Sequence, residues 1–458
     1  MNDGSTPHRV RRTTRIHLSS TLYGAATLAA AIEAGCLPPV DRSILLVANN
    51  AATPETSPPL DRMTGFKRLR ARFDDVLSWN ETIYPFHPGD WGPRPDDTPL
   101  WERHLRLLWN LGDDDIELVV ESIQVNPAMA IAQIFTDARV EVYADGLMSY
   151  GPTRNKLDPL VGSRIARLLH LDLVPGLKPL LLTEFEVEPE IVPTQIFLKV
   201  LAELADETEH LPAERGAALL LGQYLSALGI LTPEEEEDLH LRMLRGTVAL
   251  GHRRVVFKPH PTAPPRWSRL LEEEAERLGV ELAVFDEPVL AEVLYQRMAP
   301  ALVVGCFSTA LLTAAALYSI PVARTGTGLL LERLTPYQNS NRVPVTLVDA
   351  LLPDLADRAA VESQRVGPEE VADAKLAGLV QAVGYAMQAQ IYPELRPAAE
   401  RYLSKHLGSG TWRYFKRRRL TSLALPGAIP SQLAFIPRSP RLRRVARRAR
   451  SLKRSVRK

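Results

Sequence analysis

The stretch "ALVVGCFSTALLTAAALYSIPVA", Ala301 to Ala323, decides the fold class of this chain. It is uncharged and long enough to cross a lipid bilayer. However, Gly305, Ser308 and Pro321 divide it into a Val-rich strand, a turn, a helix and a second strand. Short apolar runs of this kind are typical of buried parallel strands and the helices that cover them. The stretch therefore predicts part of an α/β core rather than a membrane span.

The same alternation extends toward the N-terminus as far as about residue 215. The strand-like runs "GAALLLGQ", "RRVVFKPHP" and "VELAVFD" are separated by helical segments. One of these helices is clearly marked, because Thr232 can cap it, Pro233 suits its first turn, and acidic residues follow where the helix dipole favours them. This half of the chain predicts one parallel sheet covered by helices.

The first half of the chain has the same character. The runs "RIHL", "ILLVANN", "FDDVLSW", "IELVVES" and "RVEVYADG" read as strands, and "LYGAATLAAAIEA" and "NPAMAIAQIFTD" as helices. We therefore predict an α/β fold with two Rossmann-like, doubly wound domains facing a cleft, where ligands gather at the carboxyl ends of the strands. The predicted segments are a disordered leader (1–12), an N-terminal Rossmann-like domain (13–205), a C-terminal Rossmann-like domain (206–372), helices packing across both domains (373–437) and a basic tail (438–458).

Composition and charge narrow the class of protein. The chain has 458 residues, of which 45% are hydrophobic and 24% charged, as in globular proteins of several domains. Its net charge of +1 hides an asymmetry, because residues 438–458 contain eleven Arg or Lys and no acid, which leaves −10 for the rest. The two cysteines lie far apart, which excludes a disulfide framework and a cysteine-rich metal site. We expect a cytoplasmic protein.

The basic tail has apolar residues at helical spacing among its arginines. Such a stretch is typical of a membrane-surface helix, a nucleic-acid-binding arm or a solubilising tail. Each basic residue near an anionic leaflet contributes about 1 kcal/mol to binding. We favour an anionic membrane surface as the partner of the tail, which would place the protein at the inner membrane face.

Polar residues follow three of the predicted strands: Asp145–Gly146 in "VYADGLMSYGPTRN", Lys258–Pro261 in "VVFKPHPTAPP", and Ser308–Thr309 in "GCFSTALL". Each pattern has a structural explanation, because Asp-Gly is a common turn pair, a Lys and a His on a stiff loop can be solvated, and Ser or Thr often caps a helix. Each also suits a binding site, since the prolines hold the imidazole on a stiffened loop and a helix N-terminus with two hydroxyls can bind phosphate.

The order of these three motifs resembles that of the bacterial polysialyltransferase and lipooligosaccharide sialyltransferase families, which have a GT-B fold. The resemblance extends over about residues 13 to 400. In those families the first motif has two acids before the glycine, and the second acid is the catalytic base, which corresponds to Asp145. Ala144 replaces the first acid in this chain.

The resemblance also implies the donor site. The family's His-Pro motif falls on His260 and Pro261 and its hydroxyl pair on Ser308 and Thr309. It implies catalytic residues Asp145 and His260. The residues that it places around the donor are Ser308, Thr309, Lys258, Pro261, Gly146 and Glu292, the last holding the ribose in preference to Glu287.

The implied reaction is an inverting, metal-independent transfer of sialic acid from CMP-sialic acid to a surface glycan, such as a capsule or lipooligosaccharide. A base must then deprotonate the acceptor hydroxyl, while His260 and the helix terminus stabilise the departing CMP. We expect no cofactor and no nucleic-acid partner. The alternatives are a GT-B transferase with another nucleotide sugar and a non-enzymatic protein that binds nucleic acid through the tail.

Three further patterns have structural interpretations. Asp113–Asp115 resembles a metal-binding Asp-x-Asp motif but precedes a strand, so we expect a solvated turn there. Ser19–Thr21 can cap a helix or contact a substrate. The loop "YPFHPGDWGPRPDD", residues 84–97, can line the acceptor site, although we favour a packed surface loop.

Overall fold

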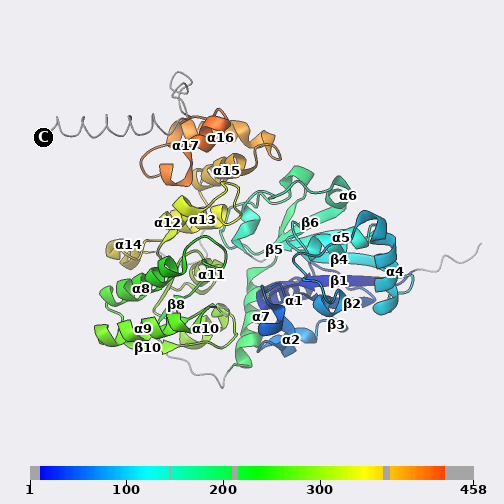
Figure 1. Ribbon diagram of the computed structural model, residues 1–458, viewed down its shortest axis with the longest axis horizontal. Helices are drawn as coiled ribbons and strands as arrows, with labels where there is room; N and C mark the ends of the chain where they lie inside the picture. Colours follow the sequence, from blue (N-terminus) through cyan, green and yellow to red (C-terminus); the bar gives the residue numbers. More distant parts are fainter. Residues whose placement is uncertain (1–10, 145, 209–214, 261–262, 365–371, 429–458) are drawn as a thin grey trace, which may run out of the picture.

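The computed structural model describes residues 11–144, 146–208, 215–260, 263–364 and 372–428 and contains two lobes (Figure 1). We call residues 13–206 the N-terminal lobe and residues 218–362 the C-terminal lobe. The lobes lie side by side, each built around one parallel sheet, and a group of C-terminal helices packs at one end (Figure 1).

The sheet of the N-terminal lobe has seven parallel strands in the order β3-β2-β1-β4-β5-β6-β7. The strand order reverses between β1 and β4, which is the switch point where ligands bind in doubly wound sheets. All five predicted strands are present, and β6 and β7 extend the sheet beyond them. The strands are β1 Thr13–Ser19, β2 Arg42–Val47, β3 Asp75–Ser78, β4 Asp115–Glu121, β5 Arg139–Ala144, β6 Ile165–His170 and β7 Pro189–Ile191.

Helices cover both faces of this sheet. One face packs on α1 and α7, and the other on α4 and α5, each with its own apolar cluster. Helix α1 is Ala-rich and almost entirely buried, so it lies close against the strands. The helices are α1 Leu22–Glu33, α2 Phe66–Arg70, α3 Trp79–Thr82, α4 Thr98–Leu108, α5 Ala128–Ile134, α6 Pro159–Gly162 and α7 Thr194–Asp206.

The sheet of the C-terminal lobe has five parallel strands in the order β10-β9-β8-β11-β12. These are β8 Ala218–Leu221, β9 Arg254–Lys258, β10 Glu281–Val284, β11 Leu302–Gly305 and β12 Val322–Arg324. Its helices are α8 Pro233–Ala249, α9 Pro265–Leu278, α10 Ala291–Met298, α11 Thr309–Tyr318, α12 Thr327–Arg333, α13 Arg342–Leu351 and α14 Arg358–Glu362. Residues 301–323 thus form β11, α11 and most of β12, as predicted. Over the described ranges, no helix is both long and apolar enough to span a bilayer.

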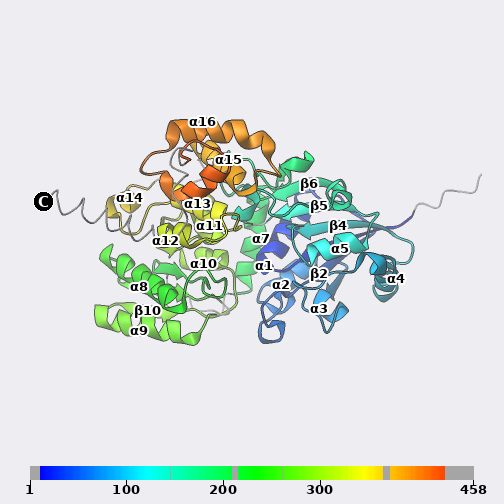
Figure 2. The ribbon, with the colours of Figure 1, turned by 45° about the horizontal axis from the view of Figure 1, so that its top comes forward.

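The C-terminal helices α15 Ala374–Gln388, α16 Arg396–His406 and α17 Arg417–Ser422 connect with both lobes (Figure 2). Toward the N-terminal lobe, the Thr153 amide donates to Tyr392 Oη at 2.8 Å. Toward the C-terminal lobe, Tyr414 Oη donates to the buried Asp349 carboxylate at 2.8 Å. Buried hydrogen bonds to both lobes hold them in one relative arrangement.

Candidate functional site

Two of the predicted motifs meet where the lobes face each other. Gly146 follows β5 of the N-terminal lobe, and Asp145 lies outside the described residues. A Cβ atom at Gly146 would lie 3.2 Å from Thr309 Oγ1 of the C-terminal lobe. The Gly146 backbone is extended (φ −144°, ψ −178°), which any residue adopts, so the close approach between the lobes favours glycine here. The two motifs therefore lie next to each other where the two lobes meet.

The hydroxyl pair begins helix α11. Ser308 is the N-cap, and its Oγ accepts from the Ala310 amide at 3.3 Å, while Thr309 is the first helical residue. Both side chains are half-buried. The preceding Phe307 amide donates to Gln223 Oε1 at 2.9 Å. Because Gln223 follows β8 and Phe307 follows β11, this bond fixes the start of α11 at the switch point of the second sheet.

Lys258 ends strand β9, which is separated from β11 by β8, and is half-buried. Its Nζ donates to the Glu287 carbonyl at 3.3 Å and lies 5.9 Å from the centroid of the Phe285 ring. Burial lowers the pKa of Lys258 to about 8, against the opposing charge of Glu292. The amine is therefore mostly protonated at pH 7 and loses its proton as the pH rises through about 8.

His260 follows on the same loop and is exposed, with its ring 6.3 Å from that of Tyr224; Pro261 lies outside the described residues. Partial desolvation and the positive charge of Lys258 lower the pKa of His260 below 6.5. The imidazole is therefore mostly neutral at pH 7 in the unliganded protein. If His260 stabilises a departing CMP as a cation or as an acid, the imidazole must therefore take up a proton when the donor binds.

The two glutamates considered for the donor ribose lie in different surroundings. Glu292, in α10, is only 3% exposed, and its Oε1 accepts from Thr313 Oγ1 of α11 at 2.7 Å. Burial raises the pKa of Glu292 above its usual range. Glu287 is exposed in the loop after β10. Glu292 therefore contacts α11 one helical turn from its start, while Glu287 lies beside Lys258.

The switch point of the first sheet holds an acid that our sequence interpretation missed. Glu121 ends β4, and its Oε2 accepts from the Ser20 amide at 2.9 Å and from Ser20 Oγ at 2.8 Å. Thr21 caps α1, and Ser122 has a left-handed backbone with φ 48°. The sequence pattern that could have indicated Glu121 is an acid at the end of a buried strand, in "VVES". Residues 19–21 thus cap α1 and form hydrogen bonds with one another and with Glu121.

A cavity of about 730 Å³ opens beyond the carboxyl ends of β2 and β3. Its walls are the segments 47–62 and 78–87, so it includes the first four residues of the aromatic loop 84–97. We expected that loop to be packed, but Tyr84 and Phe86 are 82% and 54% exposed. The expectation was therefore wrong for the start of the loop, whereas Trp91, later in the loop, packs into the aromatic cluster around Trp79.

The opposite, amino edge of the first sheet carries none of the three motifs. Asp114 lies there and accepts from Thr14 Oγ1 at 2.6 Å, next to the exposed Asp115 at the start of β4. A charged cavity of about 640 Å³ at this edge is lined by paired side chains, including Arg15 with Glu117. The Asp-x-Asp pattern is therefore a structural turn, as predicted.

Solved structures with related architectures share little sequence with this chain. A UDP-GlcNAc 2-epimerase from Methanocaldococcus jannaschii is 13% identical, with 81% of this chain and 99% of that chain covered and a TM-score of 0.48. The GT-B domain of a sialyltransferase from Photobacterium damselae is 11% identical (78% and 98% covered, TM-score 0.37). The E. coli heptosyltransferase WaaC is 15% identical (68% and 88% covered, TM-score 0.36). No curated protein sequence matches the chain.

The family comparison is more specific. A model of the alpha-2,8-polysialyltransferase family matches residues 15–327, a span that contains all three motifs and both sheets. Two doubly wound lobes, each with its own parallel sheet, are the GT-B architecture, so the predicted fold and the predicted resemblance are both confirmed. The protein is a glycosyltransferase of the sialyltransferase type, which uses a nucleotide-sugar donor and a glycan acceptor. The chain belongs to the alpha-2,8-polysialyltransferase family.

Proposed function

We propose that the protein transfers sialic acid from CMP-sialic acid to a glycan hydroxyl, with inversion at the anomeric carbon and without a metal ion. The observation that carries the proposal is the approach of Gly146 to Thr309 Oγ1, which brings the motif of the catalytic base to the N-terminus of α11. A base and a phosphate site on opposite lobes suit an in-line displacement between them.

Asp145 is the proposed base. It takes the proton of the acceptor hydroxyl, whose oxygen forms a bond to the anomeric carbon while the bond from that carbon to the phosphate oxygen of CMP breaks. CMP leaves with the electron pair of that bond. The acceptor oxygen and the departing phosphate then lie on opposite faces of the sugar, which inverts the configuration.

The C-terminal lobe is proposed to stabilise the departing CMP. The N-terminus of α11, with the Ser308 and Thr309 hydroxyls, provides donors and a favourable helix dipole for the phosphate. Lys258, with a pKa of about 8, brings a positive charge at neutral pH, and His260 gains one as phosphate charge develops beside it, because an adjacent anion raises the pKa of the imidazole. Glu292 remains our proposed ligand of the donor ribose, and Glu287 is the alternative.

Thermal-shift measurement and calorimetry with CMP, UDP, ADP and GDP test the donor. We expect CMP to stabilise the protein most, with or without EDTA. Replacing Ser308 and Thr309 together by alanine should weaken CMP binding at least tenfold, since a hydrogen bond to a charged group contributes about 1.5–3 kcal/mol. Ser363→Ala, at the residue that follows α14 and the C-terminal lobe, is the control. Preferential stabilisation by UDP would instead support the alternative donor.

We also propose that the basic residues 438–458 hold the protein at the inner membrane face. The proposal rests on sequence charge, because this segment lies outside the described residues. Eleven basic residues beside a body of net charge −10 give the chain one end with a strong attraction to anionic lipid. A capsule or lipooligosaccharide precursor at that membrane would then be the acceptor.

A further inference from the structure

The cavity beyond β2 and β3 is a preformed site on the acceptor side. Asn49 and Asn80, which follow these two strands, hold its walls together: the Asn49 amide donates to Asn80 Oδ1 at 2.8 Å, and Asn80 Nδ2 donates to the Asn49 carbonyl at 3.0 Å. Asn49 Nδ2 also donates to the Ser57 carbonyl at 2.9 Å, and His87 Nε2 lies 2.9 Å from the Ala51 carbonyl oxygen. A cavity with fixed walls needs little reorganisation to bind a ligand.

Two aromatic rings at the cavity wall lie open to solvent. Tyr84 and Phe86 are the most exposed aromatic side chains among the described residues, and Phe86 stacks on Trp91 with ring centroids 6.4 Å apart and planes at 26°. An exposed pair of large apolar side chains in a cavity is typical of a binding site. The negative face of an aromatic ring attracts weakly positive C–H groups, such as those on one face of a sugar ring.

The charges around the cavity restrict which sugar can bind. Its lining includes three acids, Glu55, Asp61 and Glu81, but one arginine, Arg62. Like charges brought together at a binding surface disfavour association. A chain of sialic acids carries one carboxylate per unit, so this lining repels it, whereas an uncharged sugar meets no such barrier.

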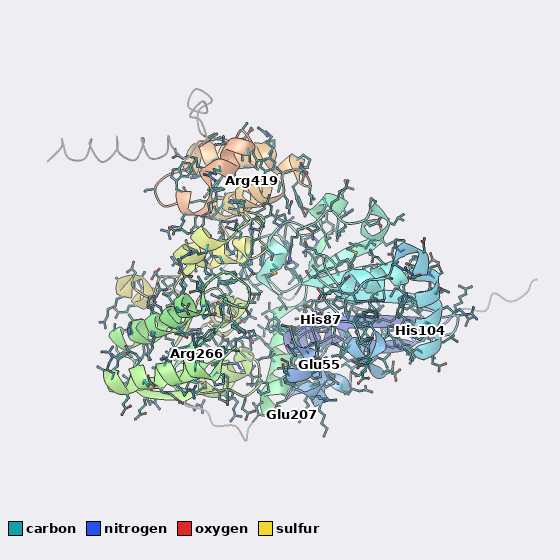
Figure 3. All side chains as sticks on the ribbon, viewed as in Figure 1. Glu55, His87, His104, Glu207, Arg266 and Arg419 are labelled. Atoms are coloured by element: carbon teal, nitrogen blue, oxygen red, sulfur yellow. The ribbon has the colours of Figure 1, made fainter. Side chains whose placement is uncertain are left out.

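The cavity lies at the same edge of the sheet as the candidate base motif. The strands are parallel, and β2 is separated from β5 by β1 and β4, which is roughly 14 Å at about 4.8 Å per strand spacing. Glu55 and His87 lie on the side of the N-terminal lobe that faces the C-terminal lobe (Figure 3). The distance suits an inner unit of an acceptor whose terminal hydroxyl reaches Gly146.

We propose that this cavity binds an uncharged sugar unit of the acceptor, so that the protein adds sialic acid to a neutral glycan rather than elongating a polysialic acid chain. The inference rests on the proposed function, which it deepens by giving the acceptor class. Tyr84 and Phe86 stack on the sugar, and the three acids select against anionic units.

Calorimetry without any donor tests the cavity separately from the transferase reaction. The probes are the uncharged disaccharides lactose, cellobiose and maltose and an α2,8-linked sialic acid tetramer. We expect the wild-type protein to bind at least one disaccharide more tightly than the tetramer. Tyr84→Ala with Phe86→Ala should weaken that binding about tenfold, the effect of uncovering roughly 55 Å² of ring surface at about 25 cal/mol per Å².

The controls are Tyr84→Phe, which keeps the ring, and Leu160→Ala, which removes an exposed apolar side chain outside the cavity. Both should keep wild-type affinity. Tighter binding of the tetramer, absence of disaccharide binding, or unchanged affinity in the double alanine variant would overturn the proposal. CMP binding measured in the same preparations separates failure of the cavity proposal from failure of the proposed function. If the protein does not prefer CMP but still binds the disaccharide, the donor assignment is contradicted and the cavity remains a sugar-binding site.

A charge-reversal variant tests the selection against anions. Glu55→Arg with Glu81→Arg should increase affinity for the sialic acid tetramer at least tenfold at low salt and leave disaccharide affinity within about twofold, because two like charges become attractive ones. High salt should reduce the gain. Unchanged tetramer affinity at low salt would refute the role of the acids.

Discussion

Substituting Gly146 by alanine should reduce transfer without destabilising the fold. The added methyl carbon would lie 3.2 Å from Thr309 Oγ1, whereas ordinary contacts begin near 3.4 Å, so Thr309 or the opposing lobe must move by at least 0.2 Å. The backbone of Gly146 suits any residue, so the substitution adds no backbone strain and reduces unfolded-state entropy by an amount equivalent to about 0.4–1 kcal/mol. Overpacking of this size costs about 1 kcal/mol, which corresponds to roughly a fivefold loss in kcat/KM.

A double-variant cycle identifies the contact as the cause. Thr309→Ala removes the atom that the new methyl group meets, so Gly146→Ala should cost little more activity in that background. Gly328→Ala is the matched control, because a Cβ there meets nothing within 4 Å and its φ is not positive. The assays are kcat/KM with CMP-sialic acid and a small acceptor, and thermal unfolding of each variant. Full activity of Gly146→Ala, or losses that add in the double variant, would refute the interlobe contact as part of the active arrangement.

Three further predictions address the base, the pH dependence and the tail. Asp145→Asn should lower transfer by about 10²–10⁴-fold and leave CMP affinity unchanged in calorimetry, since asparagine cannot accept the proton; near-normal transfer would assign the base elsewhere. CMP affinity should fall, by up to about tenfold per pH unit, as the pH rises through the Lys258 pKa of about 8, because the unliganded amine then loses its proton. Lys258→Arg should remove this pH dependence. The same pH profile in the arginine variant and the wild type would contradict the role of Lys258. Deleting residues 438–458 should release the protein from anionic vesicles and leave transfer to a soluble acceptor unchanged. Equal vesicle binding by the full-length and truncated proteins would contradict a membrane role for the tail.

Much of the fold could be predicted because the chain alternates strongly between two kinds of local pattern. The stretch 301–323 gave β11 and α11 because Gly305 and Ser308 interrupt an apolar run at the point where a strand ends and a helix is capped. Strand β6 was less recognisable, since its apolar residues share the run with Arg167, which pairs across the sheet with Glu141. A charge in a strand is explained by a partner that is distant in sequence, and local patterns do not reveal that partner.

The candidate site could be predicted in part, for a related reason. The motifs at Gly146 and Thr309 stand out by composition, but their contact depends on how two lobes pack, which no local pattern encodes. Gln223 illustrates the limit: its role is to accept a hydrogen bond from Phe307, 84 positions away. The exposure of Tyr84 likewise follows from the walls around it, because aromatic residues in a loop can be either buried or open.

The two lobes differ in electrostatics, and under the proposed function this difference separates donor from acceptor. On the C-terminal side, Lys258 and His260 have lowered pKa values in the unliganded protein, because both are desolvated and the charge of Lys258 also disfavours protonation of His260. A bound phosphate raises both pKa values, so donor binding at neutral pH takes up protons, mainly at His260, because Lys258 with a pKa of about 8 is already mostly protonated. On the N-terminal side, the acids around the cavity beyond β2 and β3 repel the same anion. The nucleotide sugar is thus directed to α11 and excluded from the cavity, which leaves the cavity free for an uncharged acceptor while the donor is bound.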